Sequence, residues 1–201
     1  MSYDDEKQPA QKIAPPVGAK QISWPLIRTQ KELSQTAETH HNGGRVYALQ
    51  GKKIGEILNS LKVIDDKTLQ AVAQHHNTRK ANGKPIGQLL IHMGIIEPEV
   101  LTRALCIQTG VPMVDLLFIH IPHEILDRIS NEKAREKKVV PVGVYNKALY
   151  LAVPDPATFS EQHLFSFMTR LNIKPVYSSP HEIDTFINTK WGGTGAEIWA
   201  G

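Results

Sequence analysis

One sequence pattern occurs twice between Lys53 and Gln108. The first copy spans residues 53–76 and the second spans residues 85–108. Ile54-Gly55 in the first copy matches Ile86-Gly87 in the second, thirty-two residues later. An internal repeat sets the architecture before single elements are assigned, because each copy is one structural unit that its neighbour must cover. The two copies are therefore expected to pack together.

Each copy predicts a short helix, a turn and a longer helix. Apolar residues recur at helical spacing in the first part of each copy, and again after a break at Lys62 or Gly94. Asp65 is a suitable N-cap for the second helix of copy one, since its carboxylate accepts from open N–H groups. Pro98 suits the first turn of the equivalent helix in copy two.

Composition excludes several classes of protein. The chain has 201 residues, of which 41% are hydrophobic and 21% charged, and its net charge of +3 is too small to argue for nucleic acid. A single cysteine, Cys106, excludes a disulfide framework and a cysteine zinc site, and its apolar neighbours predict a buried, inert thiol. No apolar run is long enough to span a bilayer, and the polar, acidic opening is unlike a signal peptide. We expect a cytoplasmic protein without direct membrane insertion.

The segment before the repeat, residues 1–48, is expected to be a poorly structured tail, because it contains few aliphatic residues. Ile22–Ile27 is the exception, and two interpretations remain open: a docking segment for a partner or for its own domain, or an isolated apolar stretch. His40-His41 precede a turn-like Asn-Gly-Gly, but two histidines alone do not make a zinc site.

After Gln108 the pattern changes from helical repeat to mixed structure. A short extended stretch is expected at 113–119, with helices at 121–129, 130–137, 159–170 and 179–191 and strands at 139–144, 148–153 and 173–177. Ser179 is the expected cap of the last helix, and Asp155 the cap of a turn. The predicted fold class is α+β: a helical tandem-repeat subdomain (49–110), then a small α+β subdomain with a three-stranded sheet (111–191), and a flexible tail (192–201).

Basic residues gather between the copies and at their starts. Lys53, Arg79, Lys80 and Lys84 are consistent with a solvated basic surface. They are also consistent with an anion site, where backbone N–H groups and cations hold phosphate oxygens. The sequence leaves both interpretations open.

Three motifs after the repeat carry a family resemblance. Gly-Val-Pro-Met-Val-Asp-Leu (110–116), Val-Val-Pro-Val (139–142) and Leu-Ala-Val-Pro-Asp-Pro (151–156) occur in this order after the doubled helical pattern. Residues 53–191 thus resemble the N-terminal, MshEN-type domain of type II secretion and type IV pilus assembly ATPases. Within that family the doubled motif implies binding of cyclic di-GMP.

The resemblance also implies which residues would hold this ligand. The positions that match the two motifs are Lys53, Ile54, Gly55, Leu69, Ala73, His76, Ile86, Gly87, Leu101, Leu105 and Gln108. Cations and backbone N–H groups suit phosphate, aliphatic side chains suit purine faces, and a glutamine amide both donates and accepts. The chain departs from the motif where Lys53 and Pro85 replace arginine and His76 replaces glutamine. Lysine keeps the charge but lacks the planar fork of arginine.

Catalysis is not expected. The sequence contains no G-x-x-x-x-G-K-[ST] phosphate loop and no nucleophile–base pair at motif spacing, so it should not hydrolyse ATP. Two hypotheses remain for a regulatory module that needs no cofactor. One is an adaptor of a secretion, pilus or polysaccharide export machine that is switched by cyclic di-GMP. The other is a pure protein-interaction module. The expected partner of either is an assembly ATPase or an inner-membrane assembly subunit.

Overall fold

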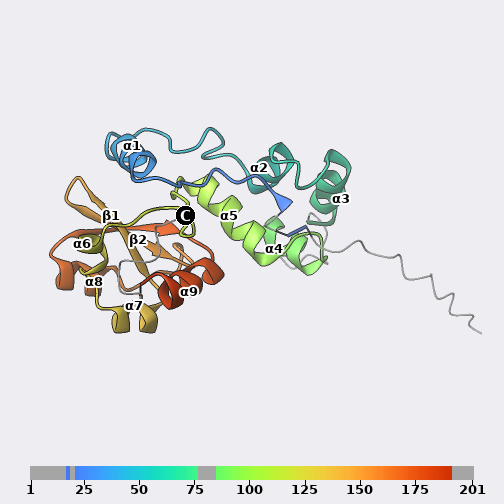
Figure 1. Cartoon of the computed structure of the whole chain (residues 1–201). Coiled ribbons are helices and arrows are strands. Elements are labelled where there is room, and N and C mark those ends of the chain that lie inside the picture. Colours follow the sequence, from blue (N-terminus) through green and yellow to red (C-terminus); the bar gives the residue numbers. More distant parts are fainter. Residues whose placement is uncertain (1–16, 19–20, 77–84, 192–201) are drawn as a thin grey trace, which may run out of the picture.

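The structure is a computed structural model that describes residues 17–18, 21–76 and 85–191. Its first half is helical (Figure 1). The first helix is α1 (Gln30–His41). Copy one of the repeat then forms α2 (Ile54–Ser60) and α3 (Asp66–His76), and copy two forms α4 (Ile86–His92) and α5 (Pro98–Thr109). The predicted helix–turn–helix organisation of both copies is confirmed. We call α2–α5 the tandem module.

The second half is the predicted small α+β arrangement. Its elements are α6 (His123–Leu126), α7 (Asn131–Lys137), β1 (Val140–Tyr145), β2 (Ala148–Val153), α8 (Gln162–Thr169), β3 (Asn172–Tyr177) and α9 (Pro180–Thr189). β1 and β2 form an antiparallel hairpin whose turn residues, Asn146 and Lys147, have φ values of 50° and 60°. β3 adds to β2 in parallel, so the sheet order is β1-β2-β3. The α+β fold class is thereby confirmed.

Local caps explain where several of these elements begin. Asp65 Oδ1 accepts from the Thr68 N–H at 2.7 Å, so the predicted cap of α3 is confirmed. Ser179 caps α9 by accepting from the Glu182 N–H. Asp155 Oδ1 accepts from the Ala157 N–H and holds the turn after β2.

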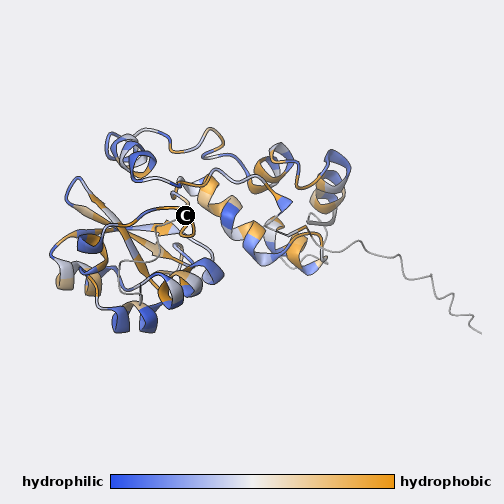
Figure 2. Cartoon of the chain, in the orientation of Figure 1, coloured by the Kyte–Doolittle hydropathy of each residue, from blue (hydrophilic) through white to orange (hydrophobic). Residues whose placement is uncertain are grey.

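Apolar side chains form one cluster inside the tandem module and two around the sheet. The cluster of the tandem module extends to Met113 and Tyr177, which belong to the second half. Figure 2 shows the apolar residues concentrated on the strands and along α5, whereas α7 is largely hydrophilic. The boundary between two subdomains near residue 110 stays a prediction, because α5 and Tyr177 share one core.

Residues 1–48 were expected to be a poorly structured tail. This prediction is wrong for residues 30–41, which form α1. Thr29 and Glu32 form a capping box at the start of this helix, and Leu33 and Ala37 are fully buried against the sheet cluster. Leu33 and Ala37 are the two apolar residues of this helix, and its other residues are polar. Its composition is therefore similar to that of a linker. The tails at 1–16 and 192–201 lie outside the described residues.

The segment before α1, described at residues 17–18 and 21–28, is called here the N-terminal strap. Val17 bridges to Ile96 in the tandem module, and Ile27 bridges to Val114 in the second half. Ile22, Trp24 and Leu26 pack against the core of the tandem module. Of the two interpretations of Ile22–Ile27, the structure supports docking onto the chain's own domain.

Two further expectations need correction. The stretch 113–119 is extended only at its start, because residues 116–118 turn after Asp115, whose Oδ1 accepts from the Leu117 N–H. The helix expected at 121–129 is limited to α6. Within the described residues, no helix is long and apolar enough to cross a membrane.

Candidate functional site in the tandem module

The two copies of the repeat pack reciprocally. Helix α2 of copy one contacts α5 of copy two, and α4 of copy two contacts α3 of copy one. The equivalent short helices, α2 and α4, also contact each other. Each short helix thus contacts the long helix of the other copy, which confirms that the copies cover one another.

The turns inside the two copies have the same geometry. In copy one the N–H groups of Leu61, Lys62 and Val63 donate to Ile57, Asn59 and Leu58. The three equivalent bonds recur thirty-two residues later, at Met93, Gly94 and Ile95. Lys62 has a φ of 58° and Gly94 a φ of 66°, so both copies end the short helix with a left-handed residue.

The paired glycines let the helices of each copy approach closely. A Cβ added to Gly55 would lie 2.6 Å from Leu69 Cδ1, and one added to Gly87 would lie 2.4 Å from Leu101 Cδ1. These four positions were predicted as ligand-binding residues. The structure brings them together in pairs, where they serve helix packing.

The starts of the two copies share one backbone conformation. Lys53 precedes α2 with φ −67° and ψ 147°, and Pro85 precedes α4 with φ −57° and ψ 147°. Proline is therefore accommodated without strain, since its ring fixes φ near this value. Both residues are exposed, whereas Ile54 is buried and Ile86 half-buried.

The end of copy two lies beside the start of copy one. Gln108 Nε2 donates to the Lys52 carbonyl oxygen at 2.9 Å, and the Gly51 N–H donates to the Gln108 carbonyl oxygen at 2.9 Å. Gln108 and Lys53, two predicted ligand residues fifty-five positions apart, are thus next to each other in space. The side chain of His76, which closes copy one, lies outside the described residues.

The remaining predicted residues lie on the second helices. Ala73 is half-buried on α3, and Leu105 is 37% exposed on α5. Leu101 and Leu105 help to line a mainly apolar cavity of about 390 Å³. Its other walls were not predicted, because they come from α4 and from the turn after β2: Gln88, Ile91, Asp155, Pro156 and Ala157.

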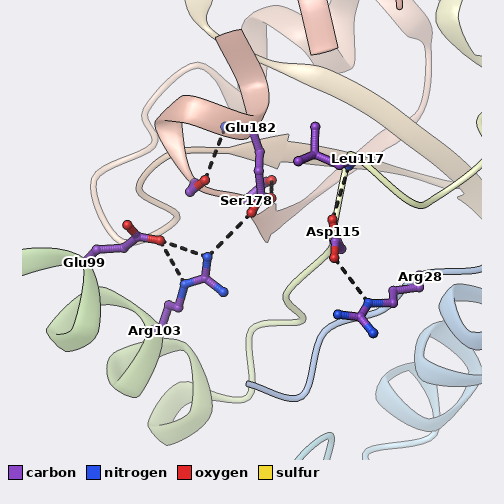
Figure 3. Close-up of polar contacts among 8 residues, drawn as sticks. Arg28, Glu99, Arg103, Asp115, Leu117, Ser178 and Glu182 are labelled. Atoms are coloured by element: carbon purple, nitrogen blue, oxygen red, sulfur yellow. Dashed lines mark hydrogen bonds and ion pairs between the residues drawn. The ribbon is translucent and has the colours of Figure 1, made fainter. Parts of the chain in front are cut away.

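Sequence reasoning also missed the buried guanidinium of Arg103. This residue is 6% exposed, and its Nη2 lies 2.8 Å from Glu99 Oε1 and 3.6 Å from Glu182 Oε1 (Figure 3). The guanidinium also lies over the rings of Trp24 and Tyr177. Arg103 therefore joins α5 to the N-terminal strap, to β3 and to α9. The only signal in the sequence was the i, i+4 spacing of Glu99 and Arg103.

A second ion pair connects the strap to the second half. Arg28 Nε donates to Asp115 Oδ2 at 3.2 Å (Figure 3). Asp115 belongs to the Gly-Val-Pro-Met-Val-Asp-Leu motif, so its carboxylate is a structural anchor for the strap and for the turn at Leu117.

The chemistry available to these residues is binding rather than nucleophilic attack. Cys106 is buried, and burial raises the pKa of its thiol to about 12, so the thiol stays protonated near neutral pH. This agrees with the predicted inert thiol. Among the described residues, no group of three or more histidine, cysteine, aspartate or glutamate side chains is placed to hold a metal ion.

Comparison with known proteins finds a family match for the second half. Residues 109–189 match the MshEN domain, a range that begins at the last residue of α5. The type IV pilus assembly ATPase PilB of Myxococcus xanthus is 28% identical over 146 residues, which cover 73% of this chain and 25% of the relative. PilB of Thermus thermophilus is 25% identical over 103 residues, which cover 51% and 11%. The chain thus spans a quarter or less of the length of these relatives.

Solved structures with a similar arrangement include one described as MshE with cdg, which is 20% identical and has a TM-score of 0.47 over 68% of this chain and 97% of that one. The N-terminal domain of XpsE is also 20% identical, with a TM-score of 0.41 over 68% and 92%. The family match at residues 109–189 and the pilus ATPase relatives confirm the resemblance drawn from the sequence.

Proposed function

We propose that the chain is a non-catalytic regulatory or adaptor domain of a type II secretion, type IV pilus or polysaccharide export machine, and that its tandem module binds cyclic di-GMP. The MshEN match and the pilus ATPase relatives support the assignment to such a machine. The ligand follows from the doubled motif. Its partner in the machine would be an assembly ATPase or an inner-membrane assembly subunit.

The observation that carries the ligand proposal is the position of Gln108 beside the start of copy one. Its Nε2 bonds to the Lys52 carbonyl, so its amide lies next to Lys53. Within the described part of the chain, no carboxylate pairs with Lys53 and no donor reaches Gln108 Oε1. A cation and an amide acceptor are therefore available together, which suits a phosphate and the N–H edge of a guanine.

The symmetry of the module fits the same ligand. Cyclic di-GMP consists of two identical halves, each with one phosphate and one guanine. In the reciprocal contacts of α2 with α5 and of α3 with α4, each short helix packs on the long helix of the other copy. A ligand with twofold symmetry can therefore make equivalent contacts with both copies, although the copies differ at Lys53 and Pro85.

The test removes the two polar groups separately. Gln108→Ala and Lys53→Ala should each weaken cyclic di-GMP binding by about tenfold or more, because a hydrogen bond to a charged group contributes about 1.5–3 kcal/mol. Lys31→Ala is the matched control, since Lys31 is an exposed lysine on α1, outside the tandem module. Equal affinities for all three variants would rule out this site.

A specific surface supports the alternative of a protein-interaction module. Leu164, Phe167 and Met168 are exposed at i, i+3 and i+4 spacing on α8, and Phe167 is 87% exposed. Large exposed apolar side chains on one helix face are typical of docking surfaces. In this alternative, α8 would dock an assembly subunit. Phe167→Ser would then abolish capture of that subunit and leave cyclic di-GMP affinity unchanged.

A further inference from the structure

A polar cavity between α1 and the sheet is separate from the tandem module. It has a volume of about 280 Å³ and is lined by His40, His41, Tyr145, Asn146, Ala148, Tyr150, Asn172 and Lys174. The two histidines come from the last turn of α1. The other six residues come from the three strands and from the turn between β1 and β2.

Strand register explains why these residues converge. Tyr145 pairs with Ala148, which in turn pairs with Asn172, so these three residues form one row across the sheet. Tyr150 pairs with Lys174, two residues further along each strand and therefore on the same face. The first turns of α1 cover this face with Leu33 and Ala37. Its last turn instead presents His40 and His41, so the apolar contact ends and a polar cavity begins.

The lining has positive and hydrogen-bonding groups and no carboxylate among the described residues. Lys174 supplies an ammonium group, and Asn146 and Asn172 supply amide donors. The carbonyl groups of the last turn of α1 form the negative end of the helix dipole. They accept hydrogen bonds from the backbone N–H groups of Asn42, Gly43 and Gly44, which reduces their negative potential at the cavity. A cavity of this charge is suited to an anion.

We infer that this cavity binds a small dianionic oxyanion, such as a sulfate or a phosphoryl group. The Lys174 ammonium is the main charge partner, and the His40 ring is the second. Both groups line the cavity, so one anion can contact each of them. An anion between these two groups neutralises Lys174 and stabilises the protonated ring. The site does not depend on the proposed cyclic di-GMP binding.

The protonation state of His40 makes the binding pH-dependent. Burial, and then the charge of Lys174, lower the pKa of His40 below its usual value. Burial also raises the pKa values of Tyr145 and Tyr150, so both phenols stay neutral below pH 8. Lys174 and His41 are the other titratable groups that face the cavity. Oxyanion affinity should therefore rise as the pH falls and His40 gains its proton.

The experiment is an NMR titration of the histidine ring resonances of the full chain in sulfate, with chloride at equal ionic strength as reference. Sulfate is the probe because it stays a dianion between pH 5 and 8. The expected result is a saturable shift of the His40 signals and a higher His40 pKa in sulfate. His40→Gln and His41→Gln assign the two signals. Parallel titrations with methyl phosphate and acetate distinguish a phosphoryl ligand from a carboxylate.

The matched variants are Lys174→Gln, in the cavity, and Lys31→Gln, which removes one charge from the exposed face of α1. Lys174→Gln should weaken sulfate binding by about tenfold or more, and Lys31→Gln should leave it unchanged. Thermal unfolding of both variants checks that they are folded. The inference is overturned if sulfate moves the His40 signals no more than chloride does, or if a folded Lys174→Gln binds sulfate as tightly as the parent chain.

Discussion

Arg103 Nη2 lies 3.6 Å from Glu182 Oε1, and this ion pair joins the last helix of the tandem module to the last helix of the α+β part. Glu182 is itself fixed, because its Oε2 accepts from Ser178 Oγ at 2.6 Å and its N–H donates to Ser179 Oγ. The orientation of α5 relative to α9 thus depends on a chain of polar contacts that is mostly buried.

Removal of Arg103 should therefore destabilise the chain strongly. Arg103→Ala leaves Glu99 and Glu182 without their common cation and removes the contacts with Trp24 and Tyr177. Breaking a buried ion pair from one side costs about 3 kcal/mol, which urea unfolding followed by circular dichroism measures. Lys138→Ala, which removes an exposed ion pair with Asp184, is the control and should hardly move the midpoint. Equal effects of the two substitutions would refute the structural role of Arg103.

The two turn residues of the tandem module offer a reciprocal test. Lys62 and Gly94 occupy the same left-handed position, and a Cβ on Gly94 would meet no atom within 4 Å. Lys62→Gly should stabilise the chain by about 1 kcal/mol, and Gly94→Lys should destabilise it by a similar amount, because only the backbone preference changes. Unfolding free energies that shift in the same direction in both variants would contradict the equivalence of the turns.

The close approach of Gly87 to Leu101 leads to a further prediction. Gly87→Ala places a Cβ 2.4 Å from Leu101 Cδ1, and this overlap costs about 1–3 kcal/mol, which exceeds the gain of up to about 1 kcal/mol from alanine in a helix. We expect a net loss of unfolding free energy. In a double-mutant cycle with Leu101→Val, which removes part of the overlap, the loss caused by Gly87→Ala should be smaller. Additive effects would show that the two residues do not limit the helix contact.

Burial of Cys106 predicts how stability depends on alkaline pH. Its thiol has a pKa of about 12 in the folded chain, compared with an ordinary value of 9.0, so the unfolded chain releases this proton first. The stabilisation is complete below about pH 9 and is lost as the pH rises toward 12. Unfolding midpoints measured from pH 8 to 11 should fall less in Cys106→Ala than in the parent chain. Tyr47 and Tyr177, whose pKa values are also raised by burial, contribute at the upper end in both chains.

The repeat, the hairpin and the caps could be predicted because each has a local cause in the sequence. Helical spacing marked α2–α5, the polar pair Asn146-Lys147 marked the hairpin, and Asp65 and Ser179 marked helix starts. The helix α1 could not be predicted from its two buried apolar residues. Its position depends instead on long-range contacts such as the bond from Gln30 Nε2 to the Val142 carbonyl oxygen.

The candidate site could be predicted only in part, because its geometry also depends on long-range contacts. The motif positions were identified in sequence, but their roles in packing depend on which helices meet. Gly55 lies against Leu69, and Gly87 against Leu101, because each short helix crosses the long helix of its own copy. The proximity of Gln108 to Lys53 arises from the reciprocal packing of the copies, which no local pattern encodes.

Calorimetric titration of the chain with cyclic di-GMP, with GTP and cyclic di-AMP as controls, is the decisive experiment for ligand binding by the tandem module. We expect saturable binding at micromolar affinity or tighter, and no comparable binding of the two controls. The affinity should drop by about tenfold or more in Gln108→Ala, because that amide is the one the structure places beside Lys53. Absence of binding heat together with an unchanged thermal unfolding midpoint in saturating cyclic di-GMP would contradict ligand binding by the tandem module and favour the interaction surface on α8 as the functional site.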